Sequence, residues 1–360
     1  MKKFLAIFTI ISIMTFAGCS NDEEDAITEA TDEATEIEAE ETPAEETEND
    51  TADEPGEAAV EAVEINVGVI QGPSAMGLVV VMDEAENEDA VYNFTLVGSP
   101  DAVVPDIVQG NFDIAAVPPN IASILYNNTD GEIQVIAIGT LGVLYIVEAG
   151  DEITSVEDLQ GRTIYASGAG GAPEFVLNYI LEGNGIDPDN DVNIEWLAEH
   201  TEVASRMAIS DDGVAMLPQP FVTVAMTENE DLRIALDLTE EWDQVQALDD
   251  GPTSALVMGV IVARREFIDQ NPEAVENFLD RFEDSVQFVN GDIEEAAQLI
   301  EEFDIFPAPI ATRALPYSNI TFIEGTEMEE LLSGFLQVLY EQNPESIGGE
   351  MPSEEFYYIQ

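Results

Sequence analysis

The sequence predicts an α/β fold whose sheets are covered by helices on both faces. From residue 65 onward, short apolar runs of strand character alternate with helical segments. Turns containing Gly, Pro or Asn separate many of these runs from the helices that follow them. Repeated strand–helix units of this kind form sheets whose ligands bind beyond the carboxyl ends of the strands.

The first series of units spans residues 65–138. A buried strand at 65–70 leads through a Gly-Pro-Ser turn into an apolar helix that runs to Met82. Further strands are expected at 91–97, 113–117 and 133–138, and further helices at 101–109 and up to Tyr126. The turns after these strands should gather at one edge of the sheet.

A second series follows, and then a mostly helical C-terminal part. Its strands are expected at 143–147, from 163, and at 192–196, 213–217, 232–236 and 255–263, with helices after Pro173, from about Thr201 and after Phe221. The C-terminal part is expected to contain helices at 271–289, 293–303 and 328–340 and a short strand at 320–323.

The stretch from Thr163 to Leu181 reads as a strand, a glycine-rich turn and a helix with Pro173 near its first position. Proline suits that position because its missing N–H would have no helical partner there. The turn from Ser167 to Ala172 exposes backbone N–H groups, and a helix start of this kind attracts anions and polar oxygens. We expect this turn to form one half of a ligand clamp, although a turn that only connects two elements has the same pattern.

The charge of the chain excludes two classes of partner. It carries 76 acidic and 9 basic residues, which gives a formal net charge of −67. Two of the basic residues are Lys2 and Lys3, and the other seven are arginines. So acidic a surface repels nucleic acid and anionic lipid, and neither is expected as a partner.

Thermal stability is expected to rise with salt, because ions screen the repulsion among the surface carboxylates. The measurement is the midpoint of thermal unfolding between low and molar salt. A midpoint that does not rise would contradict the hypothesis that this surface is suited to a saline setting.

The first 18 residues (1–18) have the form of an export signal peptide. Lys2 and Lys3 precede an apolar stretch from Phe4 to Phe16 that is too short for a comfortable membrane span. The single cysteine, Cys19, follows directly, and the junction resembles the lipobox of bacterial lipoproteins. Phe16 replaces the usual aliphatic residue. We expect Cys19 to be lipidated, with palmitate or a similar acyl chain, and to hold the chain outside the cytoplasm on the cell membrane.

Residues 19–63 form an acidic segment without aromatic side chains. From Ser20 to Glu64 there are 20 acidic residues and no basic one. Such a segment cannot bury a core, so we expect a disordered tether between the lipid and the folded part. A helical alternative is opposed by like charges four residues apart.

Three runs carry a resemblance to a known family. They are I-N-V-G-V-I-Q-G-P-S from Ile65, V-Q-G-N-F-D-I-A from Val108 and S-V-E-D-L-Q-G-R-T-I from Ser155. From Glu64 to the C-terminus the order of the pieces resembles substrate-binding lipoproteins of ABC importers, and most closely the nitrate, sulfonate and taurine group. The resemblance implies the type II periplasmic-binding-protein fold, in which two α/β lobes are joined by two crossover strands and the ligand lies in the cleft between them.

This resemblance divides the chain into two lobes. Lobe I would comprise residues 64–147 and 256–360, and lobe II residues 148–255. The implied function is capture of a small molecule in the interlobe cleft and its delivery to an ABC permease and its ATPase subunits. We expect a monomer without a cofactor.

The expected ligand-binding residues of lobe I lie in turns at strand ends. They are Gln71, Gly72, Ser74, Ser99, Asn120 and Thr140. Gln71 and Asn120 offer amide donors and acceptors, while Ser74 and Ser99 offer hydroxyls. Both serines occupy positions where a helix N-cap is expected, and capping alone is the alternative role.

The expected ligand-binding residues of lobe II lie in the glycine turn and in two later turns. They are Ser167, Gly168, Gly170, Gly171, Ala172, His200, Gln219 and Phe221. Phe221 could stack on a flat ligand or belong to the core. For His200 the default is a capping or surface role, and since the chain has 1 His and 1 Cys, no metal site is expected.

The positions of the arginines bear on the ligand's charge. Arg206 and Arg313 lie outside the strand-end turns. An anionic ligand would therefore depend on the backbone donors of the glycine turn, and a neutral, cationic or aromatic ligand suits so acidic a protein at least as well.

Two other functions compete with transport. An exported lipoprotein that senses a solute would have the same sequence features, and the presence of neighbouring permease and ATPase genes would separate the two. An enzyme on the same fold is disfavoured, because the sequence shows no recognisable pair of nucleophile and base and we therefore expect no catalytic residue.

Overall fold

The computed structural model describes residues 63–87, 91–248 and 253–359. The predicted signal peptide, Cys19 and the acidic segment up to residue 62 lie outside these residues. Among the helices of the described ranges, none combines the length and apolarity that crossing a bilayer requires.

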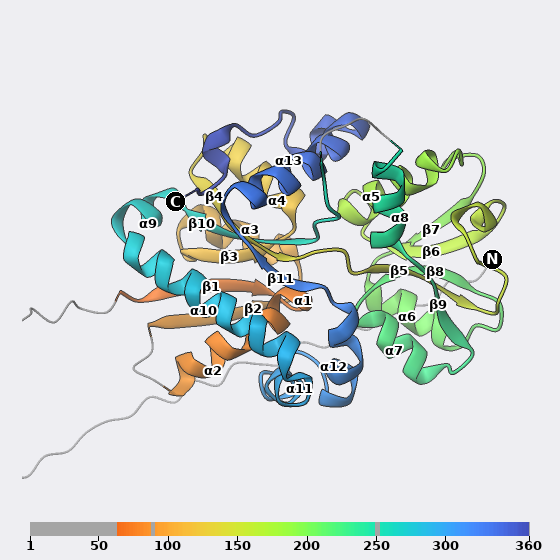
Figure 1. The fold of residues 1–360 in the computed structure, drawn as a ribbon, viewed down its shortest axis with the longest axis horizontal. Coiled ribbons are helices and arrows are strands. Elements are labelled where there is room, and N and C mark those ends of the chain that lie inside the picture. The colour runs from red at the N-terminus through yellow and green to blue at the C-terminus, as the bar shows by residue number, and fades with distance from the viewer. Residues whose placement is uncertain (1–62, 88–90, 249–252, 360) are drawn as a thin grey trace, which may run out of the picture. The chain divides into compact units, whose positions relative to one another are not determined.

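The strands form two sheets (Figure 1). The strands are β1 (Ile65–Ile70), β2 (Tyr92–Val97), β3 (Ile114–Val117), β4 (Ile133–Thr140), β5 (Leu144–Ala149), β6 (Thr163–Ser167), β7 (Asn193–Leu197), β8 (Val214–Pro218), β9 (Leu232–Asp237), β10 (Gly259–Arg264) and β11 (Ile320–Ile323). A six-stranded sheet has the order β11-β4-β10-β3-β1-β2, and a five-stranded sheet has the order β7-β6-β8-β5-β9.

The helices connect these strands and cover the sheets. They are α1 (Pro73–Gly77), α2 (Val79–Asn87), α3 (Pro100–Gln109), α4 (Pro119–Asn128), α5 (Ala172–Gly183), α6 (His200–Ala208), α7 (Phe221–Glu228), α8 (Leu238–Gln246), α9 (Arg265–Gln270), α10 (Pro272–Gly291), α11 (Ile293–Glu302), α12 (Ala308–Ala314) and α13 (Gly325–Gln342).

Each sheet combines parallel strands with one antiparallel strand inside it. In the six-stranded sheet β1 runs parallel to β2 and β3, while β10 runs antiparallel between β3 and β4. In the five-stranded sheet β6 runs parallel to β7 and β8, while β5 runs antiparallel between β8 and β9. Because β10 is antiparallel, its first residue lies at the edge where β1, β3 and β4 end.

The six-stranded sheet is buried on both faces, as the apolar runs predict. Along β3, Ala115 and Val117 belong to one core cluster, whereas Ile114 and Ala116 belong to another. Helices α4 and α13 supply side chains to the first cluster, and α1, α2 and α10 supply the second. Side chains of a strand alternate between faces, so the two clusters lie on opposite sides of the sheet.

The chain passes between the sheets twice. Residues 141–143 connect β4 to β5, and residues 253–258 lead into β10. At Gly142 the first connection lies against Thr239, because a Cβ there would come within 2.1 Å of Thr239 Oγ1. Since β5 pairs wholly within the five-stranded sheet, a lobe boundary at 147 would divide a strand. We therefore propose that the boundary of lobe I lies at 141–143.

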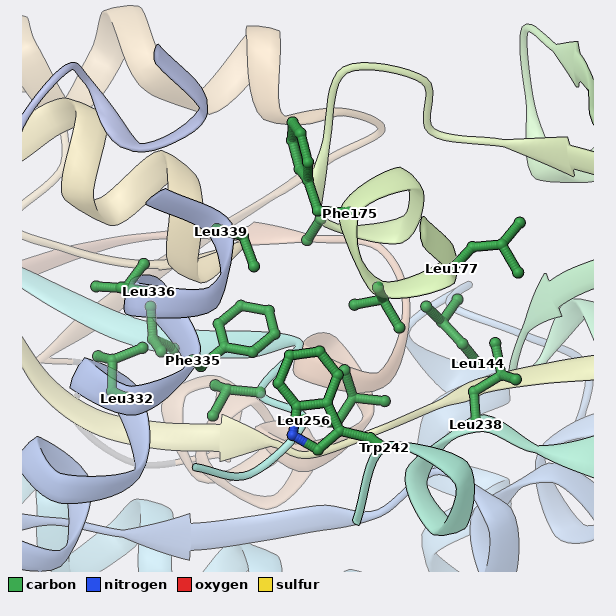
Figure 2. Close-up of a cluster of buried hydrophobic side chains, with 14 of the residues drawn as sticks. Leu144, Phe175, Leu177, Leu238, Trp242, Leu256, Leu332, Phe335, Leu336 and Leu339 are labelled. Atoms are coloured by element: carbon green, nitrogen blue, oxygen red, sulfur yellow. The ribbon is translucent and has the colours of Figure 1, made fainter. Parts of the chain in front are cut away.

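One hydrophobic cluster contains residues from both sheets (Figure 2). Trp242 of α8 is fully buried, and its ring lies 4.5 Å from that of Tyr179 and 5.4 Å from that of Phe335. Helix α13 also reaches across by a hydrogen bond, in which Gln342 Nε2 donates to the carbonyl of Phe175. The C-terminal helix thus packs against the part of the chain expected to form lobe II.

The structure departs from the predicted elements at several places. The helix predicted to run to Met82 is divided into α1 and α2, and α2 continues to Asn87. Strand β10 begins at Gly259, and residues 255–258 form an irregular connection where a strand was predicted. Helices α8, α9 and α12 were not predicted, because they are short and their few apolar residues do not repeat over enough turns to give a period.

Candidate functional site

The candidates on the six-stranded sheet meet at one edge, as predicted. Thr140 ends β4, Asn120 lies in the first turn of α4 after β3, and Gln71 follows β1. Ser99 follows the outermost strand, β2, and is exposed. The strand order therefore brings Thr140, Asn120 and the β1 turn close together and leaves Ser99 at the margin.

The alternative role of the two serines, capping a helix with the side chain, is fulfilled by neither. Ser74 lies inside α1, whose N-cap is Gly72 with φ of 144°. Ser99 occupies the N-cap position of α3, but its side chain makes no capping hydrogen bond. Met76 of α1 is a fully buried core residue.

Thr140 presents a buried hydroxyl that has no partner. Its residue is 2% exposed, and Oγ1 makes no hydrogen bond among the described residues. It faces the start of β10, where a Cβ on Gly259 would lie 3.1 Å from Thr140 Oγ1 and 2.8 Å from Ser74 Oγ. The two hydroxyls therefore converge on the same glycine.

On the five-stranded sheet, Ser167, His200 and Phe221 come together from three neighbouring strand ends. They follow β6, β7 and β8, which are adjacent in the order β7-β6-β8. Ser167 Oγ and His200 Nδ1 share a hydrogen bond of 2.6 Å, and the rings of His200 and Phe221 lie 5.3 Å apart. His200 does not cap α6, because Glu199 is the N-cap. Its half-buried imidazole contacts Ser167 and Phe221 instead.

Burial lowers the pKa of His200 from 6.5 to about 4. An imidazolium would lose its hydration here, and desolvation disfavours the charged form. His200 is therefore neutral at pH 7 and offers one donor and one acceptor nitrogen.

Acidification is expected to destabilise the protein through His200. The unfolded chain binds a proton near pH 6.5 and the folded chain only near pH 4, so stability is lost as the pH falls through this window. Replacing His200 by Asn, whose amide can stand near the position of Nδ1, removes this titration. Between pH 7 and 4 the wild type should lose up to about 3 kcal/mol more than the variant in urea unfolding. An identical pH dependence of the two proteins would contradict a buried neutral imidazole.

A segment that sequence reasoning missed links the two groups of candidates. Gln71 Nε2 donates to the carbonyls of Asp304 and Ile305, at 3.2 and 2.9 Å. The next residue, Phe306, lies edge-on to Phe221 with a centroid distance of 5.7 Å. Residues 304–306 thus join the β1 turn to the three-ring group of His200, Phe221 and Phe306. The only signal in the sequence was a Phe-Asp-Ile-Phe-Pro run between helical patterns.

Gln219 lies beneath this group, not on its surface. It is 1% exposed, and its Oε1 accepts hydrogen bonds from the backbone N–H and the hydroxyl of Thr223. The peptide bond between Gln219 and Pro220 is cis. The side chain amide therefore fixes the start of α7, which carries Phe221.

The glycine turn has the predicted helix start but already holds a carboxylate. Gly168 and Gly170 have φ of 90° and 76°, a region that favours glycine, and Gly171 is the N-cap of α5. Ala172, the first helical residue, is buried. The N–H of Gly170 donates to Glu174 Oε2 at 2.6 Å. An anion at this N–H would have to displace the chain's own acid.

The arginines of the described residues are committed elsewhere. Carboxylates lie within 4.0 Å of all but Arg313; the paired arginines are Arg162, Arg206, Arg233, Arg264, Arg265 and Arg281. Arg313 of α12 donates to Thr227 Oγ1 of α7 at 2.8 Å. Across the described ranges, no group of three or more His, Cys, Asp or Glu side chains is placed to hold a metal ion.

A separate hollow of about 590 Å³ lies at the opposite edge of the five-stranded sheet. Thr163 and Val214, the first residues of β6 and β8, line it together with Asp151, Asp211 and Asp212. Ligands of such folds bind at the carboxyl ends of strands, so this acidic hollow is distinct from the candidate site.

Comparison with known proteins identifies a family for this chain. The family described as NMT1/THI5 like matches residues 103–296, more than half of the chain. None of the curated proteins matches the chain.

Solved structures of binding proteins share the fold. An ABC transporter protein from Parabacteroides distasonis has 22% identity and a TM-score of 0.68, with 82% of this chain and 99% of that chain covered. The periplasmic aliphatic sulphonate binding protein SsuA from Escherichia coli has 13% identity and a TM-score of 0.64, with 82% and 92% covered. The periplasmic nitrate-binding protein NrtA from Synechocystis has 14% identity and a TM-score of 0.57, with 82% and 84% covered. The fold is therefore that of the type II periplasmic binding proteins.

Proposed function

The chain belongs to the family described as NMT1/THI5 like, and from that premise we propose that it captures a small solute between two lobes and delivers it to an ABC permease. The observation that carries the proposal is the meeting of strand-end side chains from both sheets. Gln71 contacts the segment 304–306, and that segment reaches Phe221 and His200 through Phe306. Polar and aromatic groups that converge in this way from two domains are typical of ligand sites.

We propose that solute binding closes the lobes about the two connections. Residues 141–143 and 253–258 are the short segments that join the sheets, and closing motions are absorbed by a few residues of this kind. The Phe221–Phe306 pair lies between the lobes, so an arriving flat solute can take the place of one ring against the other.

The roles of individual residues follow from this proposal. Ser74, Asn120 and Thr140 would bind the solute from lobe I, with Gln71, Gly72 and Ser99 at the rim. Ser167, His200, Phe221 and the glycine turn (Gly168, Gly170, Gly171 and Ala172) would bind it from lobe II. Gln219 would position Phe221, because its amide oxygen accepts from Thr223 at the start of α7, and its NH2 group would be left to meet the solute.

We propose binding without catalysis at this site. Ser167 and His200 form a hydroxyl–imidazole pair, but an imidazole whose pKa has fallen to about 4 is a weak general base at neutral pH. Ser167 is only 2% exposed.

Export and anchoring complete the proposal. The signal peptide, lipidation at Cys19 and the acidic tether would hold a monomeric receptor outside the cytoplasm beside its permease and ATPase subunits. A tethered receptor suits a cell without an enclosing periplasm, where a free one would diffuse away. The relatives bind an aliphatic sulphonate or nitrate by their names, so these anions are the first solutes to try.

A thermal-shift screen of soluble metabolites tests the proposal. A solute at a hundred times its dissociation constant stabilises the native state by about 2.7 kcal/mol, which is several degrees for a protein of this size. Replacing Phe221 by Ala should weaken the binding of any solute found by at least tenfold, whereas replacing Arg162, at the opposite edge of the sheet, should leave it unchanged. A broad screen without any stabilising solute would contradict capture of a small molecule.

A further inference from the structure

Three neutral side chains at the carboxyl edge of the six-stranded sheet have no hydrogen-bond partner within the part of the chain that the structure describes. They are Ser74, Asn120 and the unpaired hydroxyl of Thr140. Asn120 is 4% exposed and Thr140 is 2% exposed. Of the three, only the Thr140 hydroxyl is a fully buried atom without a partner. Such a group costs about 1–3 kcal/mol, and its presence in a native protein needs an explanation.

These three side chains lie around one place. β10 is flanked by β3 and β4, and its first residue, Gly259, has no side chain of its own. Ser74 Oγ and Thr140 Oγ1 both approach Gly259, at 2.8 and 3.1 Å from where its Cβ would stand. Asn120 follows β3 on the other side of β10 from Thr140. The side chains of Ser74 and Thr140 fill the space that a Cβ of Gly259 would take. A solute group that reaches this edge of the sheet would therefore meet two hydroxyls and an amide.

Among the residues that the structure describes, no cation is free to balance a charge on such a solute. The arginine with a contact close to the site is Arg313, which donates a hydrogen bond to Thr227 of α7. Thr227 lies six residues after Phe221 on this helix, which is about 9 Å along the helix axis. The other arginines have carboxylate partners. In the glycine turn Glu174 already occupies the N–H of Gly170.

The net charge of the whole chain also disfavours an anionic solute. With a formal net charge of −67, the chain repels anions at low ionic strength. His200 remains neutral at pH 7 and contributes no cation either.

We infer that the solute is uncharged where it is held, and that its amide or hydroxyl groups are selected by Ser74, Asn120 and Thr140. This inference rests on the proposed function and narrows it. By this inference, the solute of this chain differs in charge from the sulphonate and nitrate that the names of two structurally similar proteins specify. The solute supplies the missing partner of Thr140 and brings no charge that would need a counter-ion.

A matched thermal-shift panel at constant ionic strength tests the inference. The anionic and zwitterionic probes are nitrate, ethanesulfonate and taurine, and the uncharged probes are acetamide, nicotinamide and myo-inositol. Stabilisation by an uncharged probe alone is the expected result. Stabilisation by nitrate or ethanesulfonate would overturn the inference and leave the proposed function intact. No stabilisation by either kind would count against both.

Replacing Thr140 by Val tests the role of the hydroxyl. Valine keeps the shape and removes an oxygen that lacks a partner, so the midpoint of thermal unfolding without solute should rise or stay constant. The affinity for the bound uncharged probe should fall at least tenfold, and Thr140→Ser should retain it. A lower midpoint without solute would show that the hydroxyl is already bonded, and would overturn the inference.

Thr239 provides the matched control. Its Oγ1 is also buried and without a partner, but it lies against Gly142 in the connection between the sheets. Thr239→Val should leave the affinity unchanged. If both variants lost affinity equally, the loss would come from a change in the connection between the sheets. That result would overturn the inference that Thr140 contacts the solute directly.

Discussion

Replacing Trp242 by Ala is expected to lower the free energy of unfolding by about 4 kcal/mol. The indole is fully buried, packs against the rings of Tyr179 and Phe335, and donates from Nε1 to Ser254 Oγ at 3.1 Å. Its loss leaves a cavity and an unpaired hydroxyl at the start of the second connection. Urea unfolding followed by circular dichroism measures the change.

The same substitution should weaken the link between the sheets. Figure 2 shows Trp242 beside Leu256, and the indole packs against Phe335 of α13. Without the indole, the two halves of the chain should unfold in separate transitions. Trp242→Phe, which keeps an aromatic ring, should retain a single transition and lose less stability. A loss below about 1 kcal/mol in the Ala variant would contradict the packing described here.

Replacing Arg233 by Met is expected to cost about 3 kcal/mol, because it leaves a buried carboxylate without its counter-charge. The side chain of Glu148 is 1% exposed, and Arg233 Nη2 lies 2.6 Å from its Oε2. The carboxylate also accepts the backbone N–H groups of Glu152 and Ile153. This network fixes the end of β5, the first strand after the connection between the sheets.

Two variants control for the loss of a charge as such. Arg162 also lies 2.6 Å from a carboxylate, but its partner Glu152 is 70% exposed, so Arg162→Met should cost less than about 1 kcal/mol. Adding Glu148→Gln to Arg233→Met removes the bare charge and should recover part of the loss. If the Arg162 and Arg233 variants lost equal stability in urea unfolding, burial of Glu148 would not be the cause.

The order of elements could be predicted because it depends on local pattern. The run of β3 is apolar throughout and that of β1 is apolar except for Asn66, and these strands lie in the buried interior of the sheet. The turns after these strands contain the Pro and Gly residues that end one element and start the next. The strand order within each sheet could not be predicted in this way, since no local pattern specifies which strands pair.

The candidate site could be predicted only as a set of positions. Thr140, Asn120, Ser167 and Phe221 lie at strand ends, and a strand end can be read from the sequence. The surroundings of the Thr140 hydroxyl include Gly259, which lies more than a hundred residues away in the chain, so they cannot be read from the local sequence. The same holds for Phe306, which reaches Phe221 from a turn between two helices.

The glycine turn shows most clearly why local reasoning falls short. Its φ values and helix start agree with an anion-binding turn. Glu174 lies four residues after Gly170, one helical turn along, and its carboxylate takes the N–H that a ligand would need. The sequence contained this acid, but only the geometry shows its contact.

Small-angle X-ray scattering with and without a stabilising solute tests most directly whether the two lobes close on a captured molecule. If the solute binds between the lobes and they close about residues 141–143 and 253–258, the radius of gyration should fall on saturation and return when the solute is removed. A solute that binds with calorimetrically measured affinity while the radius of gyration stays the same would contradict capture by closure.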